Sequence, residues 1–268
     1  MIGNHGTAVT QDLVEMGSRR YVFLEHSLPP SSGSFLVSVG ADDLRSFIVI
    51  RGQVEVRPLD GEAAGTAEYS YLHGWHAWGT AFTMVSISRE TAIVLEAGVD
   101  GVSPGSCFPA RLSPLSDYTV DKPWGHEIWY TENGERVPYA LKQIHMTAGR
   151  RSSLQSHRFK AETNYVVDGR VTVLNGTYAP ADGEAVDAAA IPRQALGQLT
   201  SWTSAPGMLH RVIAETDYTS IEVSTPELDD VIRWADDTAR GNGRIAAEHG
   251  QISAERGRVA AEHARGLR

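Results

Sequence analysis

Cysteine is almost absent from this sequence, and long apolar runs are absent altogether. The 268 residues include one cysteine, Cys107, so no disulfide can form within the chain and nothing ties it to an oxidising compartment. No run approaches the roughly 18 apolar residues that a membrane helix needs, and the N-terminus shows no apolar segment of signal-peptide length. We therefore expect a cytoplasmic protein without a membrane partner.

Positive charge is also in the minority. The 24 Lys and Arg residues stand against 33 Asp and Glu residues, which gives a formal net charge of -9. A phosphate backbone repels such a chain, so we expect no nucleic acid as a partner. The hydrophobic content of 41% in a chain of this length is enough for a large core, which we expect to be divided between two domains.

Short runs rich in Val, Ile, Tyr and Phe recur along the chain between clusters of Gly, Pro, Asp and Ser. Runs of this length and spacing predict an antiparallel sandwich or a small barrel. A segment with four prolines, 104–123, is interpreted as a linker. The predicted strands are 21–24, 34–39, 46–56, 81–88 and 92–97 before it, and 140–146, 162–167, 170–174, 198–202, 210–214 and 219–224 after it.

Both halves contain a strand that ends at a glycine and is followed directly by a second strand. These hairpins are centred on Gly52 and Gly169, where glycine supplies a turn conformation that other residues resist. The repetition predicts two copies of one fold. Potential metal ligands precede Gly169 but not Gly52, so metal chemistry is assigned to the second copy.

Three potential metal ligands fall within eight residues of the second copy: Gln155, His157 and Glu162. Residues two apart in a strand face the same side, and a turn can bring Glu162 back from the next strand. His210, at the start of a later strand, offers a fourth ligand. Such a set suits Zn²⁺, Mn²⁺, Fe²⁺, Co²⁺ or Ni²⁺. The alternative is that both histidines are ordinary polar residues near strand ends.

The spacing of these residues resembles the cupin superfamily. Its first motif runs Gly, five residues, His-x-His, three or four residues, Glu, six residues, Gly, and its second motif adds a later His. The gaps from Gly149 to Gln155 and from Glu162 to Gly169 match this pattern. His157 takes the second His position, and Gln155 stands in the first.

Residues 117–240 are similar, in order and without large gaps, to the cupin domain of type II mannose-6-phosphate isomerases. The matching segments are Lys122–Gly125, Tyr139–Gly149, Ser153–His157, Pro206–Arg211 and Asp229–Arg240. The resemblance implies an all-β protein of two tandem cupin barrels, also called double-stranded β-helices or jelly rolls. The first, at 1–116, is a degenerate cupin-like domain, and the second, at 117–240, is the metal-binding cupin domain.

The resemblance also implies a metal-dependent isomerase of carbohydrate metabolism. Such an enzyme interconverts an aldose and a ketose through an enediolate, here with a sugar phosphate as the expected small-molecule substrate. The four ligands above would hold a metal ion that polarises the substrate carbonyl. Lys142 and Arg240 would hold the phosphate or the developing oxyanion. Glu127 and His126 are candidates for the base, which stays unassigned.

The sequence departs from this family in ways that leave other functions open. Lys160 replaces the usual Arg after the metal histidine, and residues 1–116 do not contain the Gly-rich nucleotide loop of the nucleotidyltransferase domain that many of these isomerases carry ahead of the cupin. One alternative is a non-haem Fe²⁺ cupin oxygenase, or a tailoring isomerase or epimerase of natural-product metabolism, since two histidines and a carboxylate suit O₂ chemistry. Another is a non-catalytic sugar-binding cupin in which the metal ion braces the barrel.

Residues 241–268 contain three seven-residue units rich in Ala, Glu and Arg. This composition favours a helix, although each unit has only one sizeable apolar residue. We expect a short helical tail without a catalytic role. Exposed sheet edges and this tail also predict a homodimer.

Overall fold

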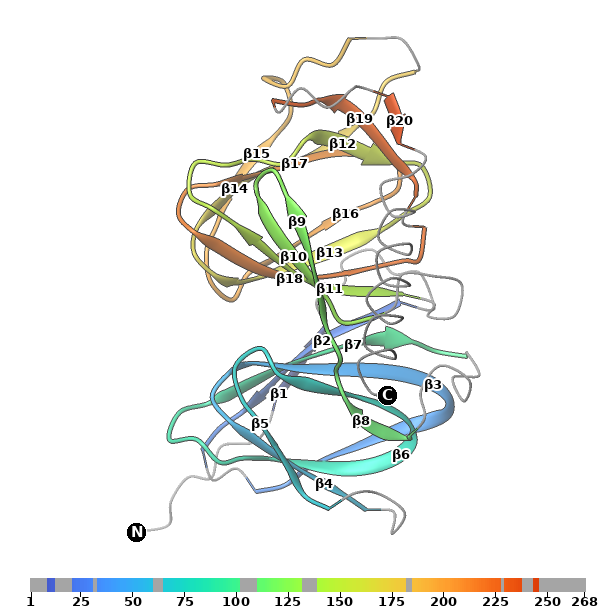
Figure 1. The fold of residues 1–268 in the computed structure, drawn as a ribbon, viewed down its shortest axis with the longest axis vertical. Helices are drawn as coiled ribbons and strands as arrows, with labels where there is room; N and C mark the ends of the chain where they lie inside the picture. Colours follow the sequence, from blue (N-terminus) through green and yellow to red (C-terminus); the bar gives the residue numbers. More distant parts are fainter. Residues whose placement is uncertain are drawn as a thin grey trace, which may run out of the picture. The chain divides into compact units, whose positions relative to one another are not determined.

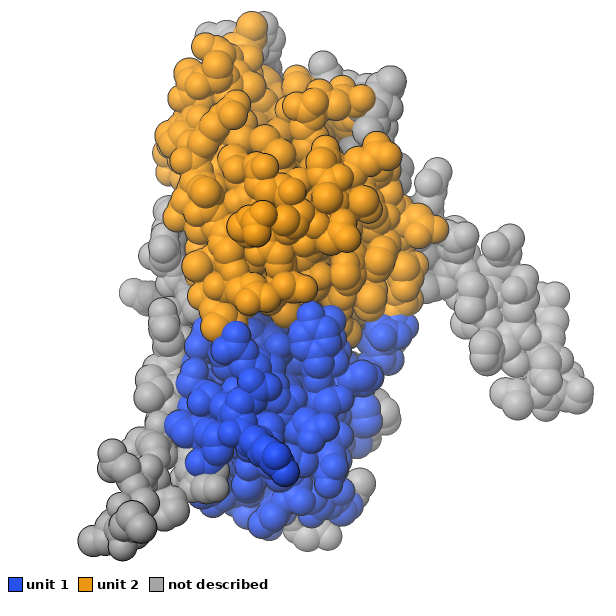
Figure 2. Space-filling view, turned by 90° about the vertical axis from the view of Figure 1, so that its left-hand side faces the viewer, with its two compact units in different colours: residues 1–117, 136–139 blue, residues 118–135, 140–268 orange. Residues whose placement is uncertain are grey.

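The structure, a computed structural model, describes residues 9–12, 21–30, 33–59, 65–101, 110–131, 139–181, 185–227, 229–237 and 243–245. Every regular element within these ranges is a β-strand, so the predicted all-β class is confirmed for them. None of these segments forms a helix long and apolar enough to cross a membrane. The chain divides into two compact units, residues 1–117 with 136–139 and residues 118–135 with 140–268 (Figure 2).

The first unit is built on one eight-stranded antiparallel sheet (Figure 1). Its strands are β1 (Val9–Asp12), β2 (Tyr21–Leu28), β3 (Phe35–Arg51), β4 (Val54–Pro58), β5 (Ala67–Tyr69), β6 (Gly74–Ser86), β7 (Ala92–Val99) and β8 (Leu112–Pro114). They follow the order β1-β2-β7-β3-β6-β4-β5, and β8 pairs with β6 off this path. The long strands β3 and β6 shift register between Val39 and Leu44, an irregularity of the kind that bends a strand.

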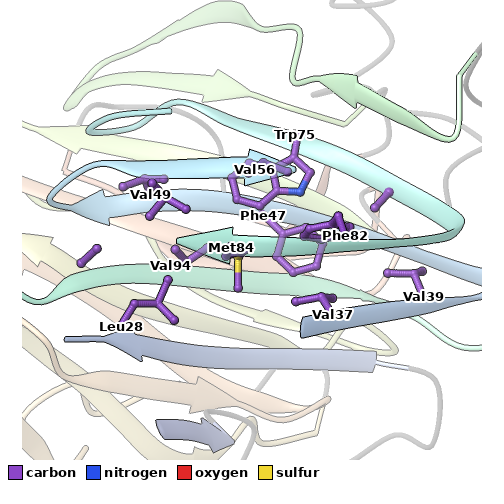
Figure 3. Close-up of a cluster of buried hydrophobic side chains, with 13 residues drawn as sticks. Leu28, Val37, Val39, Phe47, Val49, Val56, Trp75, Phe82, Met84 and Val94 are labelled. Atoms are coloured by element: carbon purple, nitrogen blue, oxygen red, sulfur yellow. The ribbon is translucent and has the colours of Figure 1, made fainter. Parts of the chain in front are cut away.

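Large apolar side chains fill the interior of the first unit (Figure 3). Phe47 stacks on Trp75 with ring centroids 5.1 Å apart, and Phe82 meets both rings edge-on. All three side chains are fully buried. Among the described residues of this unit, no three potential metal ligands come together.

The second unit contains two six-stranded antiparallel sheets, in the orders β16-β13-β18-β11-β10-β9 and β15-β14-β17-β12-β19-β20. Their strands are β9 (Tyr118–Lys122), β10 (Gly125–Trp129), β11 (Ala140–Met146), β12 (Leu154–His157), β13 (Glu162–Asp168), β14 (Val171–Tyr178), β15 (Arg193–Leu196), β16 (Ser201–Ser204), β17 (Met208–Ala214), β18 (Tyr218–Ser224), β19 (Val231–Ala235) and β20 (Gly243–Ile245). The two sheets share a core, in which Met146 and Val166 of the first pack with Val173 and Ala214 of the second.

The interpretation of residues 104–123 as a linker is wrong over the part that the structure describes. Both β8 and β9 lie within this segment, and they pair with β6 and β10. Pro114 ends β8 and Pro123 directly follows β9, so neither proline interrupts a ladder. Proline density alone therefore does not distinguish a linker from two short strands.

The predicted helical tail is wrong at residues 243–245. These residues form β20, which pairs with the edge of β19 and places Ile245 opposite Val231. Pairing satisfies backbone groups of β19 that would otherwise face solvent, and Gly243 is a poor helix former. The rest of 241–268 lies outside the described residues.

The two hairpin glycines have the backbone conformation that the sequence predicts. Gly52 has a φ of 72° and Gly169 a φ of 85°, in the left-handed region. At Gly169 an added Cβ would lie 2.1 Å from the carbonyl oxygen of Asp217. Backbone conformation and space therefore both require glycine at this turn.

Replacing Gly169 by Ala should destabilise the second unit by about 1 to 3 kcal/mol, because the strained φ and the backbone clash add together. Gly197→Ala is the matched control, since no atom lies within 4 Å of an added Cβ there. Denaturant unfolding measures both. Equal stability of the two variants would contradict the argument.

Candidate metal centre

The four predicted ligands come from three strands of the second unit. Gln155 and His157 lie two residues apart on β12, Glu162 begins β13, and His210 lies on β17. β12 and β17 are neighbours, with Gln155 opposite His210. The short turn between β12 and β13 returns the chain so that Glu162 faces both histidines.

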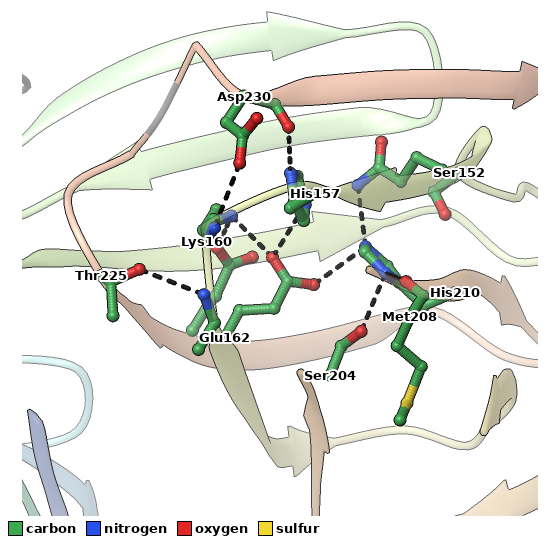
Figure 4. A network of polar contacts seen from close by, with 12 residues as sticks. Ser152, His157, Lys160, Glu162, Ser204, Met208, His210, Thr225 and Asp230 are labelled. Atoms are coloured by element: carbon green, nitrogen blue, oxygen red, sulfur yellow. Dashed lines mark hydrogen bonds and ion pairs between the residues drawn. The ribbon is translucent and has the colours of Figure 1, made fainter. Parts of the chain in front are cut away.

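The carboxylate of Glu162 lies between the two imidazole rings (Figure 4). Its Oε1 is 3.1 Å from Nε2 of His210, and its Oε2 is 3.5 Å from Nε2 of His157. The three side chains are buried, and each offers one ligand atom within 4.8 Å of the others. In the part of the chain that the structure describes, no other group of three does so.

Hydrogen bonds on the far side of each ring turn the Nε2 atoms toward the centre of the site. Nδ1 of His157 lies 3.1 Å from the carbonyl oxygen of Asp230, and because a carbonyl only accepts, this nitrogen carries the proton. Nδ1 of His210 lies 3.0 Å from Oγ of Ser204 and 3.3 Å from the carbonyl oxygen of Met208. Both Nε2 atoms are then free to donate a lone pair to a metal ion.

Nε2 of His157 is buried and makes no hydrogen bond. Burial lowers the pKa of His157, and the positive charge of Lys160 adds to this effect against the pull of Glu162. A neutral, buried acceptor without a hydrogen bond costs free energy, which a bound cation would recover. The nitrogen, nitrogen and oxygen donors therefore fit a divalent ion such as Zn²⁺, Mn²⁺, Fe²⁺, Co²⁺ or Ni²⁺.

Gln155 is placed to add a fourth donor. Its Nε2 lies 3.1 Å from Nε2 of His210, and its Oε1 accepts a hydrogen bond of 2.9 Å from Oγ of Ser153. The two ends of an amide have nearly the same shape, so rotation by half a turn would point the oxygen at the centre. The amide nitrogen would then donate to the hydroxyl of Ser153, and no hydrogen bond to that serine would be lost.

The centre lies in a cavity of about 90 Å³. All three lysines of the chain line this cavity, together with three glutamates. The six side chains form one alternating series of ion pairs. In order, the series consists of Lys122, Glu127, Lys142, Glu222, Lys160 and Glu162. The N–O distances between successive members are 3.5, 3.1, 3.4, 3.0 and 2.6 Å.

Lys142 occupies the middle of this series, on β11. It is buried between Glu127 and Glu222, and its Nζ lies 4.9 Å from the centre of the Trp129 ring. Burial alone would lower the pKa of Lys142, but the neighbouring carboxylates outweigh burial and raise it. The side chain is therefore a charged hydrogen-bond donor that faces the cavity.

Glu127 is a predicted candidate for the base, and its charged neighbours bear on that role. Glu127 does line the cavity, from β10. Burial works to raise its pKa, but Lys142 and Lys122 outweigh burial and lower it to about 2. A carboxylate with so low a pKa is a poor base near neutral pH. We reassign Glu127 to holding Lys142 in place.

The structure describes His126 but not Arg240, the two other residues with a predicted role. His126 is next to Glu127, and the alternation of β10 points it to the opposite face of the strand. There it stacks on His145, with ring centroids 4.7 Å apart. Arg240 lies outside the described residues, so its predicted place over the barrel mouth stays a prediction.

Two residues of this site carried no predicted role. Glu222 is the only charged residue of the predicted strand Thr219–Ser224, whose other residues are apolar or carry hydroxyl groups. A single charge in such a strand is the sequence feature that could have indicated a role in the site. Asp230 accepts hydrogen bonds at Oδ2 from the backbone N–H groups of Phe159 and Lys160. No sequence pattern indicated that contact.

Comparisons with known proteins give the fold. No protein-family model and no curated protein sequence matches the chain. Among solved structures, AerE from Microcystis aeruginosa matches with a TM-score of 0.54 and 11% identity, over 83% of this chain and 99% of that one. Oxalate decarboxylase from Lactobacillus farciminis, in a formate complex, matches with a TM-score of 0.55 and 10% identity, over 85% of this chain and 88% of that one. Protein Ylba from E. coli matches with a TM-score of 0.57 and 10% identity, over 81% of each chain.

These similarities show that the chain has the cupin fold, which confirms that part of the prediction. At identities this low they show the fold alone. The oxalate decarboxylase of Bacillus subtilis, whose structure matches with a TM-score of 0.56 and 11% identity, has Mn(II) centers. A likeness to mannose-6-phosphate isomerases does not appear among these structures and rests on the sequence motifs.

Protein loaded with Mn²⁺ or Zn²⁺ and then dialysed should retain about one ion per chain. Glu162→Gln and His210→Ala should each weaken metal binding more than about 100-fold, because each removes a donor atom that faces the centre. Elemental analysis measures the metal content per chain. His73→Ala, an exposed histidine of the first unit, is the control. Equal metal content in Glu162→Gln and the control would contradict the assignment.

Glu127 should make the second unit sensitive to acid. Its pKa is about 2 in the folded chain and near 4.5 when unfolded, so its contribution is complete above pH 4.5 and disappears as the pH falls toward 2. Glu127→Gln should remove this part of the pH dependence, about 3 kcal/mol in size. Denaturant unfolding between pH 7 and 2.5 measures it, with exposed Glu227→Gln as the control. Identical pH profiles of the two variants would refute the argument.

Proposed function

We propose that the protein is a metal-dependent isomerase that acts on a small, oxygenated anion, with aldose-ketose interconversion of a sugar phosphate as its reaction. One observation carries this proposal: Nε2 of two histidines and the carboxylate of Glu162 converge in the same cavity as the charged Lys142. A centre that polarises a carbonyl and a fixed cation beside it are two of the parts that enediolate chemistry requires, and the third, a base that moves the proton between the two carbons, is not assigned to a residue.

The charges of the cavity support an anionic substrate. Its three lysines and three glutamates cancel, and its two histidines are neutral in the ligand form. A divalent ion would leave the cavity with two uncompensated positive charges. A phosphate group would neutralise both and a carboxylate group one of them, whereas a neutral sugar would neutralise neither.

Within this site the side chains have separate tasks. A bound metal ion would act as a Lewis acid on the substrate oxygens. Lys142 would donate a hydrogen bond to the oxygen on which negative charge develops, and Glu127 and Glu222 would keep it charged and oriented. Trp129 covers one side of the ammonium group and limits its access to water.

We propose that the first unit is a degenerate cupin-like barrel, covering 1–116, beside a metal-binding cupin barrel at 117–240. The similar hairpins at Gly52 and Gly169 and the coverage of more than four-fifths of the chain by cupin structures support this arrangement. The interior of the first unit holds a cluster of buried apolar side chains, and among its described residues no three potential metal ligands come together. Assembly as a homodimer stays a prediction.

A second candidate is metal-dependent chemistry on a small carboxylate, including O₂-dependent tailoring reactions. The fold shared with oxalate decarboxylases and with AerE favours it. Oxygen separates the two candidates, because an isomerase turns over anaerobically and an oxygenase does not.

Metal-loaded protein should exchange isomers of a hexose or pentose phosphate under anaerobic conditions, as measured by NMR. Lys142→Met should lower kcat by about 100- to 1000-fold, because the transition state loses its charged donor, while metal content stays unchanged. Absence of turnover on every sugar phosphate, with oxygen consumption or decarboxylation on oxalate or another carboxylate, would overturn the isomerase and favour the second candidate.

A further inference from the structure

The few lysines of this chain all lie at the metal centre. Of the 24 basic residues, 21 are arginines and three are lysines, and all three lysines line the cavity of the metal centre. Lysine usually lies on protein surfaces and is almost never fully buried without a partner. We infer that the ammonium group at each of the three positions serves to compensate the glutamates that surround it in the second unit.

Lys160 is the lysine that contacts a metal ligand. Its Nζ is 2.6 Å from Oε2 of Glu162 and 3.0 Å from Oε1 of Glu222. The backbone N–H of Lys160 donates to Oδ2 of Asp230 at 3.2 Å, so the side chain is fixed at its base as well as at its tip (Figure 4). Lys160 as a whole is only 5% exposed, so these contacts hold its ammonium group away from bulk water.

The two oxygens of Glu162 consequently have different neighbours. Oε2 is held by Lys160, whereas Oε1 faces Nε2 of His210 at 3.1 Å. A metal ion at the centre can take Oε1 without disturbing the ion pair, whereas taking Oε2 as well would bring it closer to the positive charge of Lys160. Lys160 thus favours ligation through one oxygen and leaves coordination positions open for a substrate.

The same ammonium group compensates a charge that would otherwise be costly. A carboxylate buried as deeply as Glu162 needs a cation close to it, and many small metal sites fold only when the metal ion supplies that charge. Here Lys160 supplies it from within the chain. The barrel can therefore fold before a metal ion binds, and the ion then enters a site that already holds a competing cation.

We propose that Lys160 tunes the metal centre: it shares Glu162 with the metal ion, weakens metal binding, and makes the fold independent of the metal. The proposal rests on the metal centre put forward above. It makes Lys160 a positioning residue, which acts on the substrate only through Glu162 and the ion. It also predicts that replacing Lys160, although it is a buried residue of the site, strengthens metal binding, whereas replacing most buried residues of a site weakens it.

Lys160→Met should raise the affinity for Mn²⁺ about tenfold or more, because a positive charge that repels the ion and occupies Oε2 is gone. Titration with Mn²⁺, counting free ion by electron paramagnetic resonance, measures the Kd. Without metal, this variant should melt at a lower temperature than the wild type, and Mn²⁺ should restore more of the loss than it adds to the wild type. Lys160→Arg, which keeps the charge, should bind Mn²⁺ within a few-fold of the wild type.

A double variant covers the case in which Lys160→Met alone does not fold. Lys160→Met with Glu222→Gln removes one charge of each sign, so the cavity stays balanced while the competitor for Glu162 is lost. It should also bind Mn²⁺ more tightly than the wild type. Glu222→Gln alone should bind more weakly, because Lys160 then pairs with Glu162 only.

The three lysines give a direct spectroscopic readout. Protein labelled with ¹⁵N at lysine Nζ can show at most three side-chain signals, and Zn²⁺ should shift that of Lys160 more than that of Lys122. Unchanged or weaker Mn²⁺ affinity in both Lys160→Met variants, with normal binding by the wild type, would overturn this proposal and leave the metal centre intact. A wild type that binds neither ion would overturn both.

Discussion

The burial of one carboxylate, that of Glu162, determines how this site is built. A carboxylate removed from water must be compensated, and here the compensation comes from the ammonium group of Lys160 and from two imidazoles that face it. The imidazoles are turned by groups outside the site, the carbonyl oxygen of Asp230 and the hydroxyl of Ser204. These outer contacts thus point both Nε2 atoms toward the place where Glu162 lies.

The same constraint explains the difference between the two units. Both contain a hairpin that turns at a left-handed glycine, Gly52 or Gly169. In the first unit the interior is closed by Phe47, Trp75 and Phe82, and an apolar interior of this kind needs no counter-charge. In the second unit the sheets share an apolar core but also enclose a polar cavity, in which each lysine is paired with a glutamate. An interior of alternating charges is costly to form, which is why it indicates a functional site rather than a structural one.

The local part of this architecture could be predicted from the sequence. The two-residue spacing of Gln155 and His157, the turn to Glu162 and the hairpin at Gly169 are all encoded within fifteen residues, and β11 agrees with its predicted range of 140–146. His210 is distant in sequence, and the cupin-like motif supplied it. The structure brings all four residues together at the places that the motif implies.

What could not be predicted depends on contacts between distant strands. The low pKa of Glu127 arises because β10 pairs with β11 and places Lys142 beside it, and no local pattern encodes that pairing. Four prolines in 104–123 favour a linker over strands such as β8 and β9, although strand pairing tolerates proline at strand ends. β20 was read as helix because composition favours helix, whereas the free edge of β19 favours a strand.

Anomalous diffraction from crystals of the Zn²⁺- or Mn²⁺-loaded protein tests the central claim most directly. The account predicts one strong peak in the second unit, about 2.0 to 2.3 Å from Nε2 of His157, Nε2 of His210 and Oε1 of Glu162. A peak bound through Nδ1 of either ring, a peak only at the protein surface, or Glu162 turned away from both histidines would contradict it.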